Sequence, residues 1–105
     1  MILIWNSADM CVQCSVIDDN DQRHDFEWQA GRDLARDMLG FLRDTLAKHD
    51  AAFKDIDAIA VFRGPGSYTG LRIGMTVLNT LAAAQAVPIV GGVGDSWEVD
   101  CLTRL

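Results

Sequence analysis

The chain has 105 residues, of which 50% are hydrophobic and 23% are charged, and its formal net charge is -6. This size and balance predict one globular domain with a single core and exclude an intrinsically disordered chain. The acid excess also argues against tight binding of nucleic acid by this chain alone, because an acidic surface repels phosphate backbones.

The apolar runs and the cysteines predict the cellular surroundings of the chain. No run of about 20 apolar residues is present, and the nearest approach, residues 81–94, is interrupted by Gln85 and Pro88. Residues 1–6 lack the basic start and the cleavage-site pattern of a signal peptide. The odd count of three cysteines is typical of a reducing compartment. We therefore expect a cytoplasmic protein that does not associate with membranes.

The first 30 residues predict three short strands. Residues 2–5 form a continuous apolar run, which is typical of a strand covered on both faces. Residues 11–17 predict a second strand, and the acidic segment 18–21 predicts a turn after it. Residues 24–28 alternate polar and apolar side chains, as a strand near the edge of a sheet does. Together they predict an antiparallel meander.

Residues 33–49 predict an amphipathic helix, with Asp33 near its start and Lys48 and His49 near its end in accord with the helix dipole. The apolar arc of this helix is wide enough for two stripes. We expect one stripe to cover the sheet and the other to face a partner protein. The stripe assigned to the sheet is Ala35, Leu39, Leu42 and Leu46, and the stripe assigned to a partner is Leu34, Met38 and Phe41.

The second half of the chain predicts a strand, a helix and a strand. Residues 56–62 indicate a buried strand, residues 69–86 a helix that is apolar almost all round, and Ile89 with Val90 a last strand after Pro88. This order predicts a parallel crossover. The partner-facing side of the helix is assigned to Leu71, Met75 and Leu78. The alternative is that both helices are simply buried against the sheet and each other.

All elements together predict an α/β fold, a single ribonuclease-H-like lobe over residues 1–105 with a mixed five-stranded sheet and flanking helices. A capping-box pattern at residues 96–98 adds a brief terminal helix.

A glycine-rich turn joins the buried strand to the second long helix. Gly64 and Gly66 allow positive φ at a sharp turn, and Ser67 or Thr69 can cap the helix that follows. Gly70 and Gly74 lie one turn apart, which lets that helix pack closely against a neighbour. The residues of the turn are Arg63, Gly64, Pro65, Gly66, Ser67, Tyr68, Thr69 and Gly70.

Residues 55–61 and 63–74, the latter reading RGPGSYTGLRIG, closely resemble the most characteristic stretch of the TsaB family. Weaker likenesses at residues 2–16, 29–32 and 88–91 extend the resemblance over nearly the whole chain. It covers only the first of the two lobes usual in the family, so the second lobe is expected to be absent.

The resemblance implies a fold similar to that of actin, Hsp70, hexokinase and acetate kinase. It implies a non-catalytic scaffold that needs no cofactor and pairs with TsaD, the ATP- and metal-dependent subunit, through helices of the first lobe. TsaE joins this complex, which transfers threonylcarbamoyl to adenosine of tRNA, and tRNA is met only through the complex. Two alternatives remain open: a homodimer that uses the same helix face, and a vestigial nucleotide-binding lobe.

Several residues are of types found in catalytic or metal sites, but their patterns favour structural roles. Asn6 stands where active members of the wider superfamily carry an aspartate, and an amide cannot act as a base. The glycine-rich turn lacks the lysine of a P-loop, so a role in phosphate binding is the less favoured interpretation. Cys11 and Cys14 have metal-like spacing but no second pair, and His24 and His49 lie far apart in sequence. We expect no metal site and no catalytic residue.

Overall fold

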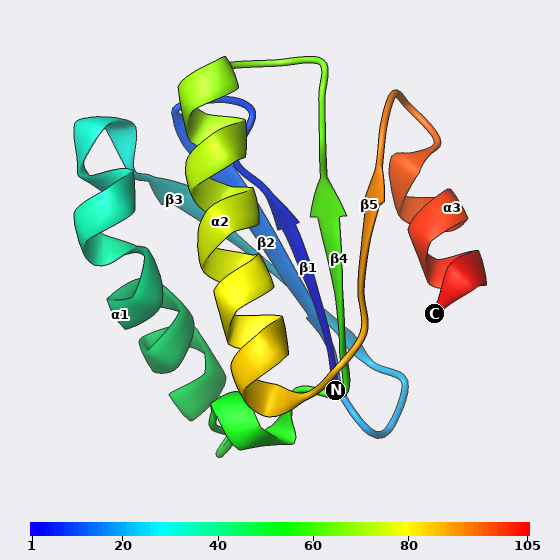
Figure 1. Ribbon diagram of the computed structural model, residues 1–105. Coiled ribbons are helices and arrows are strands. Elements are labelled where there is room, and N and C mark those ends of the chain that lie inside the picture. Colours follow the sequence, from blue (N-terminus) through cyan, green and yellow to red (C-terminus); the bar gives the residue numbers. More distant parts are fainter.

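The computed structural model describes all 105 residues and contains one five-stranded sheet in the order β3-β2-β1-β4-β5 (Figure 1). The strands are β1 (Ile2–Asn6), β2 (Cys11–Ile17), β3 (Arg23–Gln29), β4 (Ala58–Phe62) and β5 (Ile89–Gly92). The first three pair antiparallel, and β4 and β5 continue the sheet in parallel from β1. The predicted meander and the predicted crossover are both confirmed.

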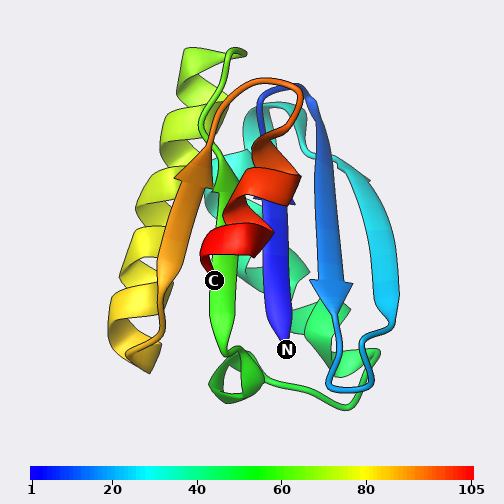
Figure 2. The ribbon, with the colours of Figure 1, turned by 90° about the vertical axis from the view of Figure 1, so that its right-hand side faces the viewer.

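Two layers of helix cover the sheet. The helices α1 (Leu34–Ala47) and α2 (Tyr68–Gln85) lie side by side on one face, and α3 (Trp97–Arg104) lies on the other (Figures 1 and 2). Short 3-10 turns, η1 (Gly31–Asp33) and η2 (Phe53–Asp55), precede α1 and β4. The predicted fold class is confirmed. None of the helices has the length and apolar character needed to cross a membrane.

The main core lies between the sheet and the pair α1 and α2. Trp5, Met38 and Leu78 are fully buried in it, and all five residues of β4 are buried. A smaller cluster of Ile4, Ala60 and Cys101 fills the space beneath α3. The three tryptophans contribute to packing: Trp5 is inaccessible, Trp28 stacks on Phe41, and Trp97 contacts Phe62.

The stripe of α1 that faces the sheet differs from the predicted one. Leu34 and Met38 are buried at 5% and 0% exposure, whereas Leu39 is 50% exposed. Leu42 and Leu46 complete the buried stripe, so it runs through positions spaced four residues apart. The assignment of Leu34 and Met38 to a partner is therefore wrong, because both side chains lie in the core of this chain. Phe41 is partly buried against Trp28 and Trp5.

The stripe of α2 assigned to a partner is also largely core. Leu71 and Leu78 are buried at 7% and 0% exposure, and Met75 is partly buried against the same cluster. The alternative of burial against the sheet is therefore correct for Leu71 and Leu78. The opposite side of α2 is the side that meets solvent.

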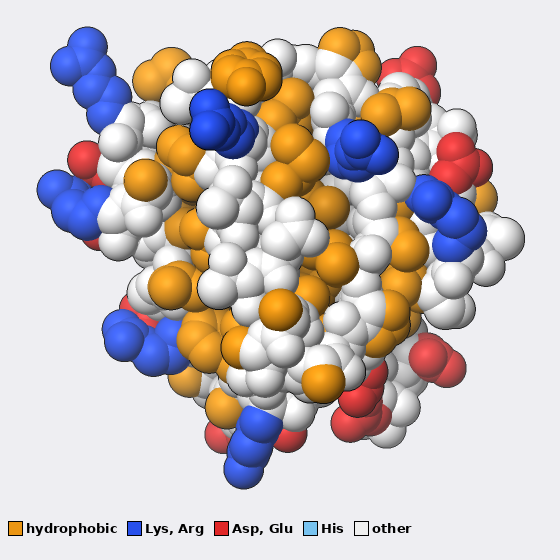
Figure 3. Space-filling view, viewed as in Figure 1, with side chains coloured by type: hydrophobic (Ala, Val, Ile, Leu, Met, Phe, Trp, Pro, Cys, Tyr) orange, Lys and Arg blue, Asp and Glu red, His pale blue; other side chains and the backbone are white.

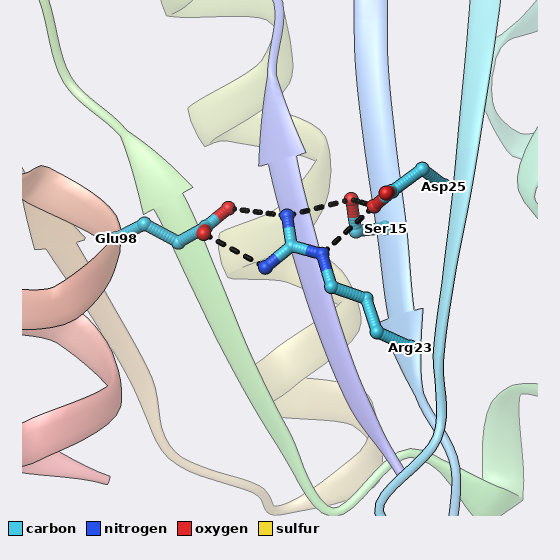
Figure 4. A network of polar contacts seen from close by, with 4 residues as sticks. All are labelled: Ser15, Arg23, Asp25 and Glu98. Carbon is cyan, nitrogen blue, oxygen red and sulfur yellow. Dashed lines mark hydrogen bonds and ion pairs between the residues drawn. The ribbon is translucent and has the colours of Figure 1, made fainter.

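A polar network ties α3 to the far edge of the sheet (Figure 4). The guanidinium of Arg23 on β3 donates two hydrogen bonds of 2.8 Å to the carboxylate of Glu98 on α3. Its Nε donates to Asp25 at 2.8 Å, and Ser15 donates its hydroxyl proton to the same carboxylate at 2.5 Å. The bond from Ser15 and the nearby Arg23 hold the pKa of Asp25 below its usual range, and Glu98 raises that of Arg23.

Arg23→Gln is expected to lower the free energy of unfolding by about 1 kcal/mol, because it removes a bidentate charge-assisted contact that is partly screened by solvent. Urea unfolding followed by circular dichroism measures this loss. Arg43→Gln is the matched control, since its ion pair with Asp44 is exposed on both sides and 3.4 Å long. Equal destabilisation by the two changes would show that the Arg23 network contributes nothing specific.

Candidate partner surface and glycine-rich turn

The glycine-rich turn is shaped by contact with the loop after β1. Gly64 has a φ of +123°, which only glycine adopts without strain. Gly66 does not have a positive φ; it is needed because a Cβ there would lie against the backbone of Ala8. The backbone N–H of Ser67 donates to the carbonyl of Ala8 at 2.8 Å, and this bond holds the turn on the loop.

Ser67, and not Thr69, caps α2. Its hydroxyl oxygen accepts a hydrogen bond of 3.4 Å from the backbone N–H of Gly70. The first turn of the helix lies directly on the end of β1, where the hydroxyl of Ser7 donates to the carbonyl of Gly70 at 2.7 Å. A Cβ on Gly70 would collide with the backbone oxygen of Ser7. The glycines of the motif therefore permit close packing, as the sequence predicted.

A pocket of about 370 Å³ opens beside this turn, between the loop after β1, η1 and the first turn of α2. Its lining includes Ser67 and Thr69 together with one acidic and one basic residue, Asp9 and Arg32, so the charged residues of the lining do not favour a phosphate. Asn6, at the end of β1, accepts a hydrogen bond of 2.9 Å from the backbone N–H of Ala8. Its side chain is therefore engaged in shaping the loop.

The solvent face of α2 carries almost no charge. Within its 18 residues Arg72 is the only ionisable side chain apart from the phenol of Tyr68 at the first position. By contrast, the 14 residues of α1 include two arginines and two aspartates. White and orange atoms cover most of the region of α2 in Figure 3, blue side chains lie near its upper end, and the red carboxylates lie toward the rims of the view. The exposed residues of α2 after its first turn are Arg72, Thr76, Asn79, Thr80, Ala83 and Ala84.

The histidines, which are distant in sequence, meet in space. The rings of His24 on β3 and His49 after α1 have centroids 4.2 Å apart, and Nε2 of His24 lies 3.0 Å from a carboxylate oxygen of Asp18. This cluster could not be predicted from the sequence, because only the folded structure brings β3 close to the end of α1. No group of three potential ligand side chains in the structure could hold a metal ion.

The cysteines are free thiols. Cys14 is buried in the main core, and burial raises its pKa to about 12. Cys11 and Cys14 differ in burial, as expected for strand residues three positions apart.

The family model of TsaD, tRNA N6-adenosine threonylcarbamoyltransferase, matches residues 28–92. The chain is 37% identical over 60 residues to the TsaB tRNA threonylcarbamoyladenosine biosynthesis protein of Escherichia coli K12. This match covers 57% of this chain and 26% of that protein. It is 44% identical over 62 residues to the tRNA N6-adenosine threonylcarbamoyltransferase of Burkholderia multivorans, covering 59% of this chain and 18% of that protein.

Solved structures agree with these relatives. YeaZ from Pseudomonas aeruginosa superposes with a TM-score of 0.77 at 26% identity, over 88% of this chain and 42% of that chain. A second Pseudomonas aeruginosa structure, described as similar to peptidase YeaZ, gives a TM-score of 0.80 at 27% identity with the same coverage. The chain thus spans less than half the length of these solved proteins and about a quarter or less of these curated ones.

Proposed function

The chain belongs to the family of TsaD, the tRNA N6-adenosine threonylcarbamoyltransferase, and is TsaB/YeaZ-like within it, and from this premise we propose that it acts in the threonylcarbamoyl modification of adenosine in tRNA. In this proposal the chain is a non-catalytic scaffold that binds a TsaD-type enzyme. TsaE would join the same assembly, and tRNA would be met there.

The observation that carries the scaffold proposal is the low charge of the solvent face of α2, on which Arg72 is the single charged side chain. Side chains at the centre of protein interfaces are depleted of charge, whereas exposed helix faces of monomers are normally charged. The face combines small and neutral polar side chains, such as Thr76, Asn79 and Ala83, which allow a second helix to approach closely. We therefore place the enzyme-binding surface on this face, in place of the buried stripe.

Two further features support the proposal. The amide of Asn6 cannot serve as a base or as an anionic metal ligand, and it is already bonded to the loop after β1. The net charge of -6 disfavours tight binding of tRNA by this chain alone, so a partner would supply most of the affinity.

Asn79→Glu tests the assignment. It places an unpaired carboxylate in the centre of the proposed interface while leaving the fold intact, because Asn79 is exposed. We expect it to weaken binding to the TsaD-type enzyme of the same organism by at least about 30-fold. Co-purification and size-exclusion chromatography with light scattering measure the complex.

The control is Val99→Glu, which adds the same charge at a position 67% exposed on α3, on the other side of the sheet. It is expected to bind like the unaltered chain. A complex that tolerates Asn79→Glu would remove α2 from the interface. A homodimer that ignores the enzyme would contradict the scaffold proposal and favour self-association through this chain.

A further inference from the structure

Two arginines without an acidic partner line one shallow pocket beside β5. Arg63 follows β4, Arg104 lies near the end of α3, and the pocket between them has a volume of about 550 Å³. Neither guanidinium forms an ion pair, whereas Arg23, Arg36 and Arg43 are each paired with a carboxylate. Arg32 and Arg72 are also unpaired, but each lies apart from this pocket. In a chain with an excess of acidic residues, two unpaired cations on one pocket are unexpected.

Both arginine side chains converge on Gly91. A Cβ on Gly91 would collide with the side chain of Arg63, with Cγ of Arg63 only 2.7 Å away, so the aliphatic part of Arg63 lies across the glycine. From the other side, Nη2 of Arg104 donates to the carbonyl oxygen of Gly91 at 2.6 Å. The backbone N–H of Arg63 is itself bonded to the carbonyl of Gly92 at 2.8 Å. The main chain of β5 thus brings the two cations together.

The remaining groups of the pocket leave a net positive charge. Asp100 is its one acidic residue and accepts a hydrogen bond of 3.2 Å from the hydroxyl of Ser96. Two guanidiniums and one carboxylate leave an excess of positive charge in the pocket, which a bound anion would balance. Forked N–H donors suit the oxygens of a phosphate, which accepts several charge-assisted hydrogen bonds at once.

We propose that Arg63 and Arg104 form a binding site for a phosphate ester, and that its source is the backbone of an RNA strand. The pocket is open and only one of its lining residues, Val93, is hydrophobic, so the base of a free nucleotide finds no apolar wall there. A phosphodiester of a longer strand needs no such wall, since the strand is held by contacts elsewhere. The choice of RNA rests on the proposed function, whereas the phosphate site rests on the pocket alone.

A weak site of this kind gains importance within an assembly. A single exposed phosphate contact is screened by salt and gives little affinity by itself. When a partner already holds the tRNA, the second contact becomes intramolecular and its effective concentration rises. An acidic chain can therefore orient RNA without binding it tightly.

The test is a titration of the ¹⁵N-labelled chain with inorganic phosphate, followed by NMR at constant ionic strength set with chloride. We expect saturable shifts of the amides of Gly91, Gly92 and Val93. Arg63→Gln should raise the dissociation constant for phosphate by at least about fivefold. The matched control is Arg72→Gln, which removes an exposed charge from α2 and should change the constant by less than about twofold. Equal effects of the two changes, or shifts spread over the whole surface, would overturn the site.

Arg104→Gln gives a second measurement, but it also removes the hydrogen bond to the carbonyl of Gly91. The effect of Arg63→Gln on phosphate binding therefore decides whether the site exists. A uridylate hexamer and AMP distinguish the sources. The RNA source is supported if the hexamer shifts the same amides at a lower concentration of ligand phosphate groups than AMP does. If AMP binds more tightly, the RNA source is overturned and the phosphate site stands. Because these titrations need no partner enzyme, their failure would be independent of a failure of the scaffold proposal.

Discussion

Leu78→Glu is expected to leave no folded protein at 25 °C, with a loss in the free energy of unfolding of at least about 4 kcal/mol. Leu78 has no accessible surface and lies in the main core between α2 and the sheet. The change removes an apolar side chain and buries a carboxylate without a partner. Far- and near-ultraviolet circular dichroism of the purified chain measures the outcome.

The neighbouring Asn79→Glu is the control for this prediction. Asn79 is exposed, so its carboxylate remains in water and the fold should persist. The two variants differ by one position and carry the same new side chain. A folded Leu78→Glu protein that has lost only its partner would show that Leu78 faces the interface, against the burial found here.

Gly74→Ala is expected to destabilise the chain by about 2–4 kcal/mol. A Cβ at this position would lie 2.7 Å from Nε1 of Trp5 and against the hydroxyl of Ser7, and both neighbours are held in the core. The added methyl group must push α2 away from β1. Urea unfolding followed by tryptophan fluorescence reports the change, since Trp5 is the side chain displaced.

Gly40→Ala is the matched control within a helix. A Cβ there would meet only the guanidinium of Arg43 at 3.9 Å, so the higher helix propensity of alanine should stabilise the chain by about 0.5–1 kcal/mol. The two glycine-to-alanine changes should therefore have opposite signs. A stabilised Gly74→Ala protein would mean that α2 does not lie as close to β1 as the structure places it.

The strands could be predicted to within two residues at each end because their signals are local. The run from Cys11 to Ile17 is bounded by turn residues on both sides, and the observed strand has the same ends. The orientation of the helices depended on a choice between adjacent apolar stripes. Leu39 lies between Arg36 and Arg43 on one helical face, and these charges were the available sign that it is exposed.

The candidate surfaces were harder to predict, because they join residues that only the fold brings together. On α2 the apolar positions predicted a partner surface, whereas the surface proposed from the structure is marked by a lack of charge on the other side of the helix. Arg63 was noted as part of the glycine-rich turn, but its neighbour Arg104 lies on α3, and nothing local in the sequence connects them. Gly91 lets the two arginine side chains approach each other, because a Cβ there would collide with Arg63. This role of the glycine could not be predicted from the sequence.

The position of β1 at the centre of the sheet sets an order for folding. On one side it pairs with β2 across a short turn, and on the other it pairs with β4, with Ile2 opposite Ala58. Closing the short loop costs little entropy, while the parallel pairs must wait until α1 and its flanking loops are spanned. The meander is therefore expected to form first, and β4, α2 and β5 to assemble on it in the slower step. The glycine-rich motif belongs to this late part, so its close fit against the end of β1 is expected to form in the slower step.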